Sequence, residues 1–268
     1  MTRAQVSRVG VALLFPDLLG TYGDSGNAVI LAQRLRWRGI AADVITVRSG
    51  EPVPESCDLY VVGGGEDLPQ ALAAKQLGGS GGPLHRAVDR GAAVLAVCAG
   101  LQILGRRFVG PDGSQSDGLG LLECETVRGG GRRSVGEILV DPDPELGLPV
   151  LTGYENHAST TLLGPSAEPV GLVVQGVGNG GGTQVDGCRS GRILGTYLHG
   201  PVLARNPALA DLVLGWVVGD LEPLDDSECE DLRAERLQSV GAEGLHDLRS
   251  PRRSIRERLG RLSGSTTA

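Results

Sequence analysis

Cys98 stands where a strand-like segment meets a helical one, in AAVLAVCAGLQILG (92–105). Apolar residues precede the thiol, and Ala96, Ala99 and Gly100 surround it with small side chains, as a tight strand-to-helix turn requires. Such a turn raises a nucleophile above a sheet edge, and the helix N-terminus stabilises a thiolate. We predict Cys98 as a nucleophile. The alternative is a buried core cysteine without a catalytic role. It stays open because the nucleophile turn usually has glycine two residues before the nucleophile, where this chain has Ala96.

A cysteine nucleophile needs a base, and the usual one is a histidine from a distant part of the chain. Of the four histidines, His85 falls in an amphipathic segment and His246 in a charged stretch, which is typical of solvated side chains. His157 and His199 each follow a strand-like run, and open α/β sheets place their sites at strand ends. His199 is the better candidate, because the apolar RILGTYL before it turns sharply at LHGP.

Three consecutive glycines, Gly63, Gly64 and Gly65, end the strand-like LYVVGGG. Without Cβ atoms the backbone can approach a ligand closely, and its N–H groups can form part of an oxyanion hole. A plain turn in a glycine-rich protein is the alternative interpretation. No GxGxxG or GxxxxGK[ST] motif occurs, so the signatures of nucleotide-binding folds are absent.

The elements that must position these residues alternate in the first half of the chain. Hydrophobic patterns predict strands at 9–15, 42–47, 59–65 and 92–97. They predict helices at 25–38, capped by Ser25, and at 66–77, 83–91 and 99–108. After residue 118, short strands, some antiparallel, and a helix at 205–219 complete the same domain. We therefore predict an α/β fold, a parallel sheet with helices on both faces.

The composition favours a reduced, cytoplasmic location. The net charge is −7, and residues 249–268 hold six arginines against one glutamate, so the rest of the chain is strongly acidic. An acidic body argues against nucleic-acid binding. No apolar run is long enough to span a membrane, and the start does not read as a secretory signal. The five cysteines form no CxxC pair, so neither a disulfide framework nor a metal site is predicted.

Seven stretches taken together resemble class I glutamine amidotransferases, in the cobyric acid synthase-like branch. The finer pattern resembles the GatD type, the glutaminase subunits of lipid II isoglutaminyl synthase. In chain order the stretches are PDLLGTYGDSGN, GGGEDLPQALAAKQL, VCAGLQILG, DGLGLLECET, RSVGEI, GYENH and GTYLHGPVLARNP. The resemblance implies a flavodoxin-like amidotransferase domain over 1–220. The acidic stretch 221–248, expected to be a helical extension, and the flexible Arg-rich tail 249–268 lie outside it; we expect the tail to contact the partner or anionic lipid.

The resemblance also implies roles for the candidate residues. Cys98 would attack the side-chain carbonyl of glutamine, and His199 would move the proton to the departing ammonia. The backbone amides of Ala99 and of Gly64 or Gly65 would hold the oxyanion. No metal site in this chain is implied.

Other positions are assigned less completely. Arg133 would pair with the α-carboxylate of glutamine, with the adjacent Arg132 as the alternative. Gly200 and Pro201 follow the histidine where many class I members have a glutamate, so a Cys–His dyad is expected. Three further residues are expected near the site without an assigned role: Asp24, Asn156 and His157. For Asp24, a structural Asx turn is equally possible.

A glutaminase that released ammonia alone would be futile, so a synthetase partner is implied. By resemblance it is a Mur-ligase-like MurT subunit, which would bind ATP and magnesium and amidate D-glutamate in the lipid II stem peptide. This chain would need no cofactor, form a heterodimer and touch the membrane peripherally at most. The alternatives are a cobyric acid synthase-like glutaminase serving a corrinoid, although those synthases usually carry a fused ATP-binding domain, and a non-catalytic scaffold.

Overall fold

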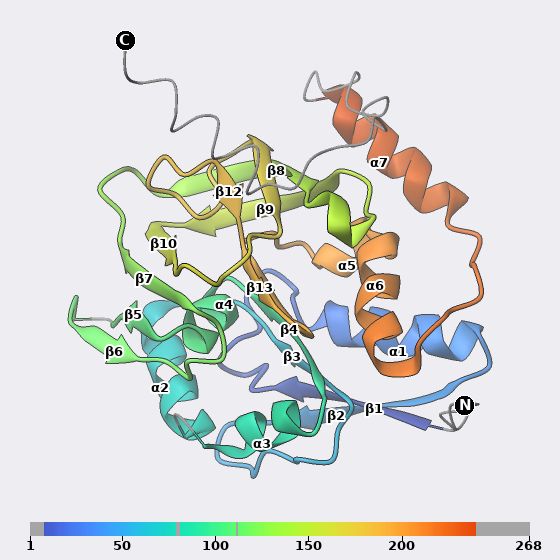
Figure 1. Cartoon of the computed structure of the whole chain (residues 1–268), viewed down its shortest axis with the longest axis horizontal. Helices are drawn as coiled ribbons and strands as arrows, with labels where there is room; N and C mark the ends of the chain where they lie inside the picture. Colours follow the sequence, from blue (N-terminus) through green and yellow to red (C-terminus); the bar gives the residue numbers. More distant parts are fainter. Residues whose placement is uncertain (1–7, 79–80, 111, 240–268) are drawn as a thin grey trace.

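The main sheet of the computed structural model has six strands; residues 8–78, 81–110 and 112–239 are described. The strands are β1 (Arg8–Leu14), β2 (Ala41–Val47), β3 (Leu59–Val62), β4 (Ala93–Val97), β13 (Cys188–Ser190) and β14 (Ile193–Thr196). Their order is β13-β14-β4-β3-β1-β2 (Figure 1). All pairs are parallel except β13 with β14. Every residue of the central strands β3 and β4 is buried, which explains their continuous apolar runs.

Helices cover both faces of this sheet (Figure 1). One group is α1 (Gly26–Trp37), α5 (Val202–Arg205) and α6 (Pro207–Val218), which contact one another. The other group is α2 (Asp67–Leu77), α3 (Pro83–Asp89) and α4 (Ala99–Leu104), with α2 against α4. Their buried leucines and alanines join the strands in one continuous hydrophobic core.

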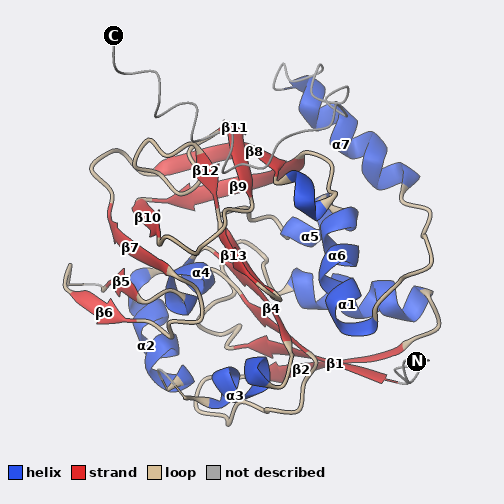
Figure 2. Cartoon of the chain, in the orientation of Figure 1, coloured by secondary structure: helices blue, strands red, loops and turns tan. Residues whose placement is uncertain are grey.

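Two four-stranded sheets lie beside the main sheet, one at the left and one at the top of Figure 2. One has the order β10-β7-β5-β6, with β5 (Arg107–Val109), β6 (Gln115–Asp117), β7 (Cys124–Arg128) and β10 (Ser159–Leu163). The other has the order β12-β11-β8-β9, with β8 (Ser134–Pro142), β9 (Leu151–His157), β11 (Gly171–Gln175) and β12 (Val185–Asp186). A 3-10 turn, Pro144–Leu146, follows β8. The predicted α/β fold with a mostly parallel sheet and additional antiparallel strands is confirmed.

Helix α7 (Ser227–Ser239) lies in the acidic stretch beyond the main sheet. Its Leu237 forms a small second core with Leu139 and Val150, and its Arg233 donates to the backbone carbonyl of Val150. Arg34 of α1, almost fully buried, holds the segment before α7 through Asp226 and also binds Asp211 of α6. Among the described residues, no helix has the length and apolar character needed to cross a bilayer. The Arg-rich tail lies outside the described residues.

Two local predictions were wrong. Ser25 makes no side-chain hydrogen bond to the start of α1. The helix after Cys98 ends at Leu104 and does not reach residue 108, because the chain turns at Gly105 and continues as β5. After this turn the N–H of Arg106 donates to the carbonyl oxygen of Cys124 at 2.8 Å, so the chain pairs with β7 where the helix was predicted to continue.

Candidate active site

Cys98 occupies the tight turn between β4 and α4, in a strained backbone conformation. Its φ is +51° and its ψ −106°, a combination that residues other than glycine rarely adopt. The next residue but one must be small, because a Cβ on Gly100 would lie 2.5 Å from the carbonyl oxygen of Val62. Cys98 is 7% exposed and lines a pocket. The strain and the small neighbours are those of a nucleophile elbow.

His199 follows β14 and is fully buried. An antiparallel bridge to Tyr154 fixes its backbone against the middle of β9. Its Nδ1 lies 2.9 Å from Oδ2 of Asp24. Burial by itself would lower the pKa of His199, but the contacts with Asp24 and Cys98 outweigh it and raise the pKa to about 10. The imidazole is therefore held between the thiol and a carboxylate.

Gly64 marks the point where these three side chains meet. A Cβ placed on it would lie 2.6 Å from Cε1 of His199, 3.0 Å from Oδ2 of Asp24 and 3.4 Å from Cβ of Cys98. The first of these three separations is shorter than any normal contact, so only glycine leaves room for the imidazole. The glycine turn predicted from the sequence therefore packs directly against a cluster of Cys98, His199 and Asp24.

The N–H groups near Cys98 are not equally free to hold an oxyanion. Gly64 donates its N–H to Oδ2 of Asp24 at 2.9 Å, so this predicted oxyanion donor is already engaged in this arrangement. Gly65 and Ala99 line the pocket beside the thiol. Ala99 is the first residue of α4, where an N–H has no intrahelical acceptor. Gly65 and Ala99 are the donors that remain candidates.

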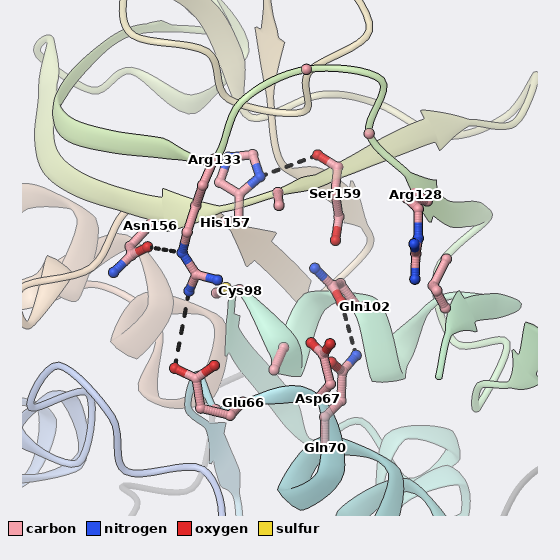
Figure 3. A pocket seen from close by; sticks show the side chains of 16 residues that line it. Glu66, Asp67, Gln70, Cys98, Gln102, Arg128, Arg133, Asn156, His157 and Ser159 are labelled. Carbon is pink, nitrogen blue, oxygen red and sulfur yellow. Dashed lines mark hydrogen bonds and ion pairs between the residues drawn. The ribbon is translucent and has the colours of Figure 1, made fainter. Parts of the chain in front are cut away.

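A pocket of about 320 Å³ opens beside Cys98, and most of its lining is polar (Figure 3). Its charged side chains are Glu66 and Asp67, which begin α2, together with Arg128 and Arg133. Both signs of charge therefore face one cavity, as a zwitterionic amino acid requires. Among the described residues, no group of three or more histidine, cysteine, aspartate or glutamate side chains could hold a metal ion.

Arg133 reaches into this pocket, and Figure 3 shows its guanidinium between Asn156 and Glu66. Its Nε donates to Oδ1 of Asn156 at 2.5 Å, and its NH2 lies 4.0 Å from Oε1 of Glu66. Arg132 is exposed and is absent from the lining. The sequence analysis missed Arg128, Glu66 and Asp67. The two acids follow the glycine turn directly and could have been inferred from that position, whereas Arg128 carries no such signal.

Asn156 and Tyr22 connect Arg133 to the imidazole. Asn156 donates through Nδ2 to the hydroxyl of Tyr22. The ring of Tyr22 meets His199 edge-on, with centroids 4.8 Å apart and an interplanar angle of 60°. Asn156 therefore belongs to the site as a bridging residue.

His157 forms part of the pocket wall and stacks on Tyr197, with ring centroids 4.0 Å apart. Its Nδ1 lies 3.2 Å from the carbonyl oxygen of Ser159, and its Nε2 lies 3.6 Å from Oε2 of Glu155. These contacts direct the two ring nitrogens of His157 toward residues of β9 and β10. His199, by contrast, lies with Cys98 against Gly64, so it remains the candidate base.

The comparisons with known proteins agree with this geometry. The model of the CobB/CobQ-like glutamine amidotransferase domain matches residues 10–207. The chain is 35% identical over 199 residues to lipid II isoglutaminyl synthase (glutamine-hydrolyzing) subunit GatD of Staphylococcus aureus, covering 74% of this chain and 79% of that one. It is 31% identical over 207 residues to the subunit of the same name of Streptococcus pneumoniae, covering 76% and 78%.

A solved structure gives the same fold. The crystal structure of a glutamine amidotransferase superimposes with a TM-score of 0.51 at 22% identity, covering 77% of this chain and 98% of that one. At this identity the match speaks for the fold alone. With the family match and the two relatives, the chain belongs to the CobB/CobQ-like glutamine amidotransferases, in the group of the GatD subunits of lipid II isoglutaminyl synthase.

Proposed function

We propose that this chain is the glutaminase subunit of a lipid II isoglutaminyl synthase, hydrolysing L-glutamine to glutamate and ammonia. One observation carries the proposal: a strained Cys98 and a buried His199 meet above Gly64, at the end of a pocket that bears both signs of charge. A scaffold without activity has no use for a strained cysteine beside a histidine. The family and the relatives support the same function.

In the proposed reaction, Sγ of Cys98 attacks the side-chain amide carbon of glutamine. His199 accepts the thiol proton and delivers it to the amide nitrogen, so ammonia leaves and a glutamyl thioester remains. The N–H groups of Gly65 and Ala99 stabilise the oxyanion. A water molecule then gives its proton to His199 and attacks the thioester, which releases glutamate and restores the thiol.

The charges of the pocket give glutamine its orientation. Arg133 binds the α-carboxylate, for which a guanidinium fork is suited, and Asn156 holds that guanidinium in place. The acids Glu66 and Asp67 line the same cavity and provide the negative charge that the α-ammonium group requires. Arg128 supplies a second positive group at the wall.

The partner in this proposal is a Mur-ligase-like subunit of the MurT type. That subunit binds ATP and magnesium and activates the α-carboxyl of D-glutamate in the lipid II stem peptide, and ammonia from Cys98 converts it to D-isoglutamine. The complex works in the cytoplasm as a heterodimer and serves peptidoglycan synthesis. A corrinoid acceptor, as in cobyric acid synthesis, is the alternative.

The test is amidation of lipid II by the chain purified with its Mur-ligase-like partner. With glutamine and ATP, we expect glutamate release and amidated lipid II, detected by mass spectrometry. Cys98→Ala should abolish amidation with glutamine but leave amidation with ammonium chloride, because only the ammonia supply is lost. Amidation of a corrinoid carboxylate in place of lipid II would overturn the assignment of the acceptor.

A further inference from the structure

We propose that Asp24 positions His199, so that glutamine hydrolysis runs on a Cys98–His199–Asp24 triad. The acid comes from the loop before α1 and not from the residues that follow the histidine, which here are Gly200 and Pro201. This inference rests on the proposed function and adds a residue to its mechanism. The dyad predicted from the sequence is thereby extended.

The contacts of Asp24 point to this role. Its side chain is fully buried, and its Oδ2 accepts from Nδ1 of His199 and from the N–H of Gly64, each at 2.9 Å. No arginine or lysine pairs with Asp24 in the described part of the chain, so His199 is the ionisable side chain paired with it there. A carboxylate buried without such a partner is costly, and an imidazolium is the group that can compensate it.

The alternative of a structural Asx turn does not fit these contacts. In such a turn the carboxylate accepts from an N–H two residues further on. Here the N–H of Gly26 donates to the carbonyl of Gly23. The donors to the Asp24 side chain are instead Gly64 and His199, both distant in sequence. The carboxylate therefore serves a tertiary contact and not its own loop.

The loop that carries Asp24 is shaped for this contact. Tyr22 and Gly23 both have left-handed φ values, +63° and +78°, so the chain reverses just before the aspartate. The N–H of Thr21 donates to the carbonyl of Gly64, which ties the reversed loop to the glycine turn. Because the ring of Tyr22 also meets His199 edge-on, one short loop holds the imidazole through an aromatic ring and a carboxylate.

The chemical consequence follows from the tautomer. A carboxylate at Nδ1 keeps a proton on that nitrogen, so Nε2 is the nitrogen that exchanges the proton with Cys98. The raised pKa of His199 favours the imidazolium, which gives its Nε2 proton to the departing ammonia. Nε2 is buried and makes no hydrogen bond to the described residues, so it is free for this transfer. Asp24 stabilises the imidazolium through the contact of its Oδ2 with Nδ1 of His199. It acts through His199 and does not itself exchange a proton.

The experiment compares Asp24→Asn with Asp17→Asn in the complex with the partner. Asp17 is an exposed aspartate of the same N-terminal region that binds Ser49, so its variant controls for the loss of a nearby charge. For Asp24→Asn we expect kcat for glutamate release to fall about 10²- to 10⁴-fold, with KM changed little. We also expect the alkaline limb of kcat/KM to move to lower pH, because Asp24 helps raise the pKa of His199.

A double variant distinguishes a purely structural role of Asp24 from a role exerted through His199. If Asp24 acts through His199, adding Asp24→Asn to His199→Ala should cost no further activity. A further loss there, or wild-type kcat and pH profile in Asp24→Asn, would overturn the proposal. If instead the wild-type complex releases no glutamate from glutamine, the proposed function fails and not the role of Asp24.

A second measurement covers the case in which Asp24 variants do not fold. The titration of His199 can be followed by nuclear magnetic resonance in Cys98→Ala, where the thiol no longer contributes. A pKa well above the ordinary 6.5 supports the pair with Asp24. A pKa at or below the ordinary value would contradict it.

Discussion

Gly64 lies so close to His199 that a Cβ on the glycine would stand 2.6 Å from Cε1 of the imidazole. The backbone of Gly64 does not need positive φ, so alanine is allowed there by conformation and excluded by the histidine. The glycine is thus explained by the residue that packs on it, and this contact gives the first prediction.

Gly64→Ala should displace the imidazole and lower kcat at least about 100-fold, a loss within the range for misplacing a catalytic group. The overall fold should remain. Gly130→Ala is the matched control, because a Cβ there meets open space and no positive φ is involved. Glutaminase assays with circular dichroism test the pair, and equal activity in the two variants would contradict the close packing.

Cys98→Ser should abolish glutaminase activity while the protein remains folded, because serine is not activated by the same base as readily as a thiol. Cys57→Ser is the control, since Cys57 is also buried but lies outside the pocket that Cys98 lines. We expect Cys57→Ser to keep its activity. Undiminished glutamate release by Cys98→Ser would contradict the covalent mechanism.

Arg133→Ala should raise KM for glutamine strongly, since loss of a charged pair to a substrate carboxylate costs about 2–4 kcal/mol. Its neighbour Arg132 is exposed outside the pocket, so Arg132→Ala should keep KM within about twofold, because surface changes away from a site cost little. The KM values for glutamine of both variants, measured by steady-state kinetics, show which arginine binds the α-carboxylate. An unchanged KM in Arg133→Ala would move the carboxylate contact to Arg128.

Asp186 should give the folded state an unusual pH dependence. It is fully buried and accepts hydrogen bonds from Oγ1 of Thr196 and the N–H of Tyr197. Burial raises its pKa from 3.8 to about 6. The folded state then binds the proton more tightly than the unfolded state, so this group's contribution to stability declines as pH rises from about 4 to 6.

Asp186→Asn tests this, because asparagine cannot ionise. Its stability relative to wild type should improve by about 2–3 kcal/mol between pH 4 and pH 7, added to a pH-independent cost of the lost acceptor. Urea unfolding at both pH values measures the difference. A difference that stays constant with pH would contradict the assignment.

Arg34→Ala should loosen helix α7. Its side chain is 3% exposed and its guanidinium binds both Asp211 and Asp226. Losing it leaves partly buried carboxylates and costs about 2–3 kcal/mol. Arg8→Ala is the control, since the Arg8–Asp43 pair is mostly exposed and worth at most about 1 kcal/mol. Hydrogen exchange should rise in α7 in Arg34→Ala and not in Arg8→Ala.

Local signals were enough for much of the fold. Continuous apolar runs predicted β3 and β4, because a strand covered on both faces must be apolar throughout. The small residues around Cys98 predicted a tight turn, since nothing larger fits there. The end of α4 was missed, because after it the chain pairs with the distant Cys124, whose carbonyl oxygen accepts from the N–H of Arg106.

The sequence by itself determined the α/β alternation, the turn at Cys98 and the strand end at His199, since each depends on neighbouring residues. Only the tertiary structure decided which acid faces His199, which glycine N–H is already engaged and which arginine enters the pocket. Asp24 and His199 are 175 residues apart, and no local pattern encodes such a distance. Their contact exists because β1, which leads to Asp24, and β14, which leads to His199, run parallel in one sheet of order β14-β4-β3-β1, so the loops after them lie at the same edge.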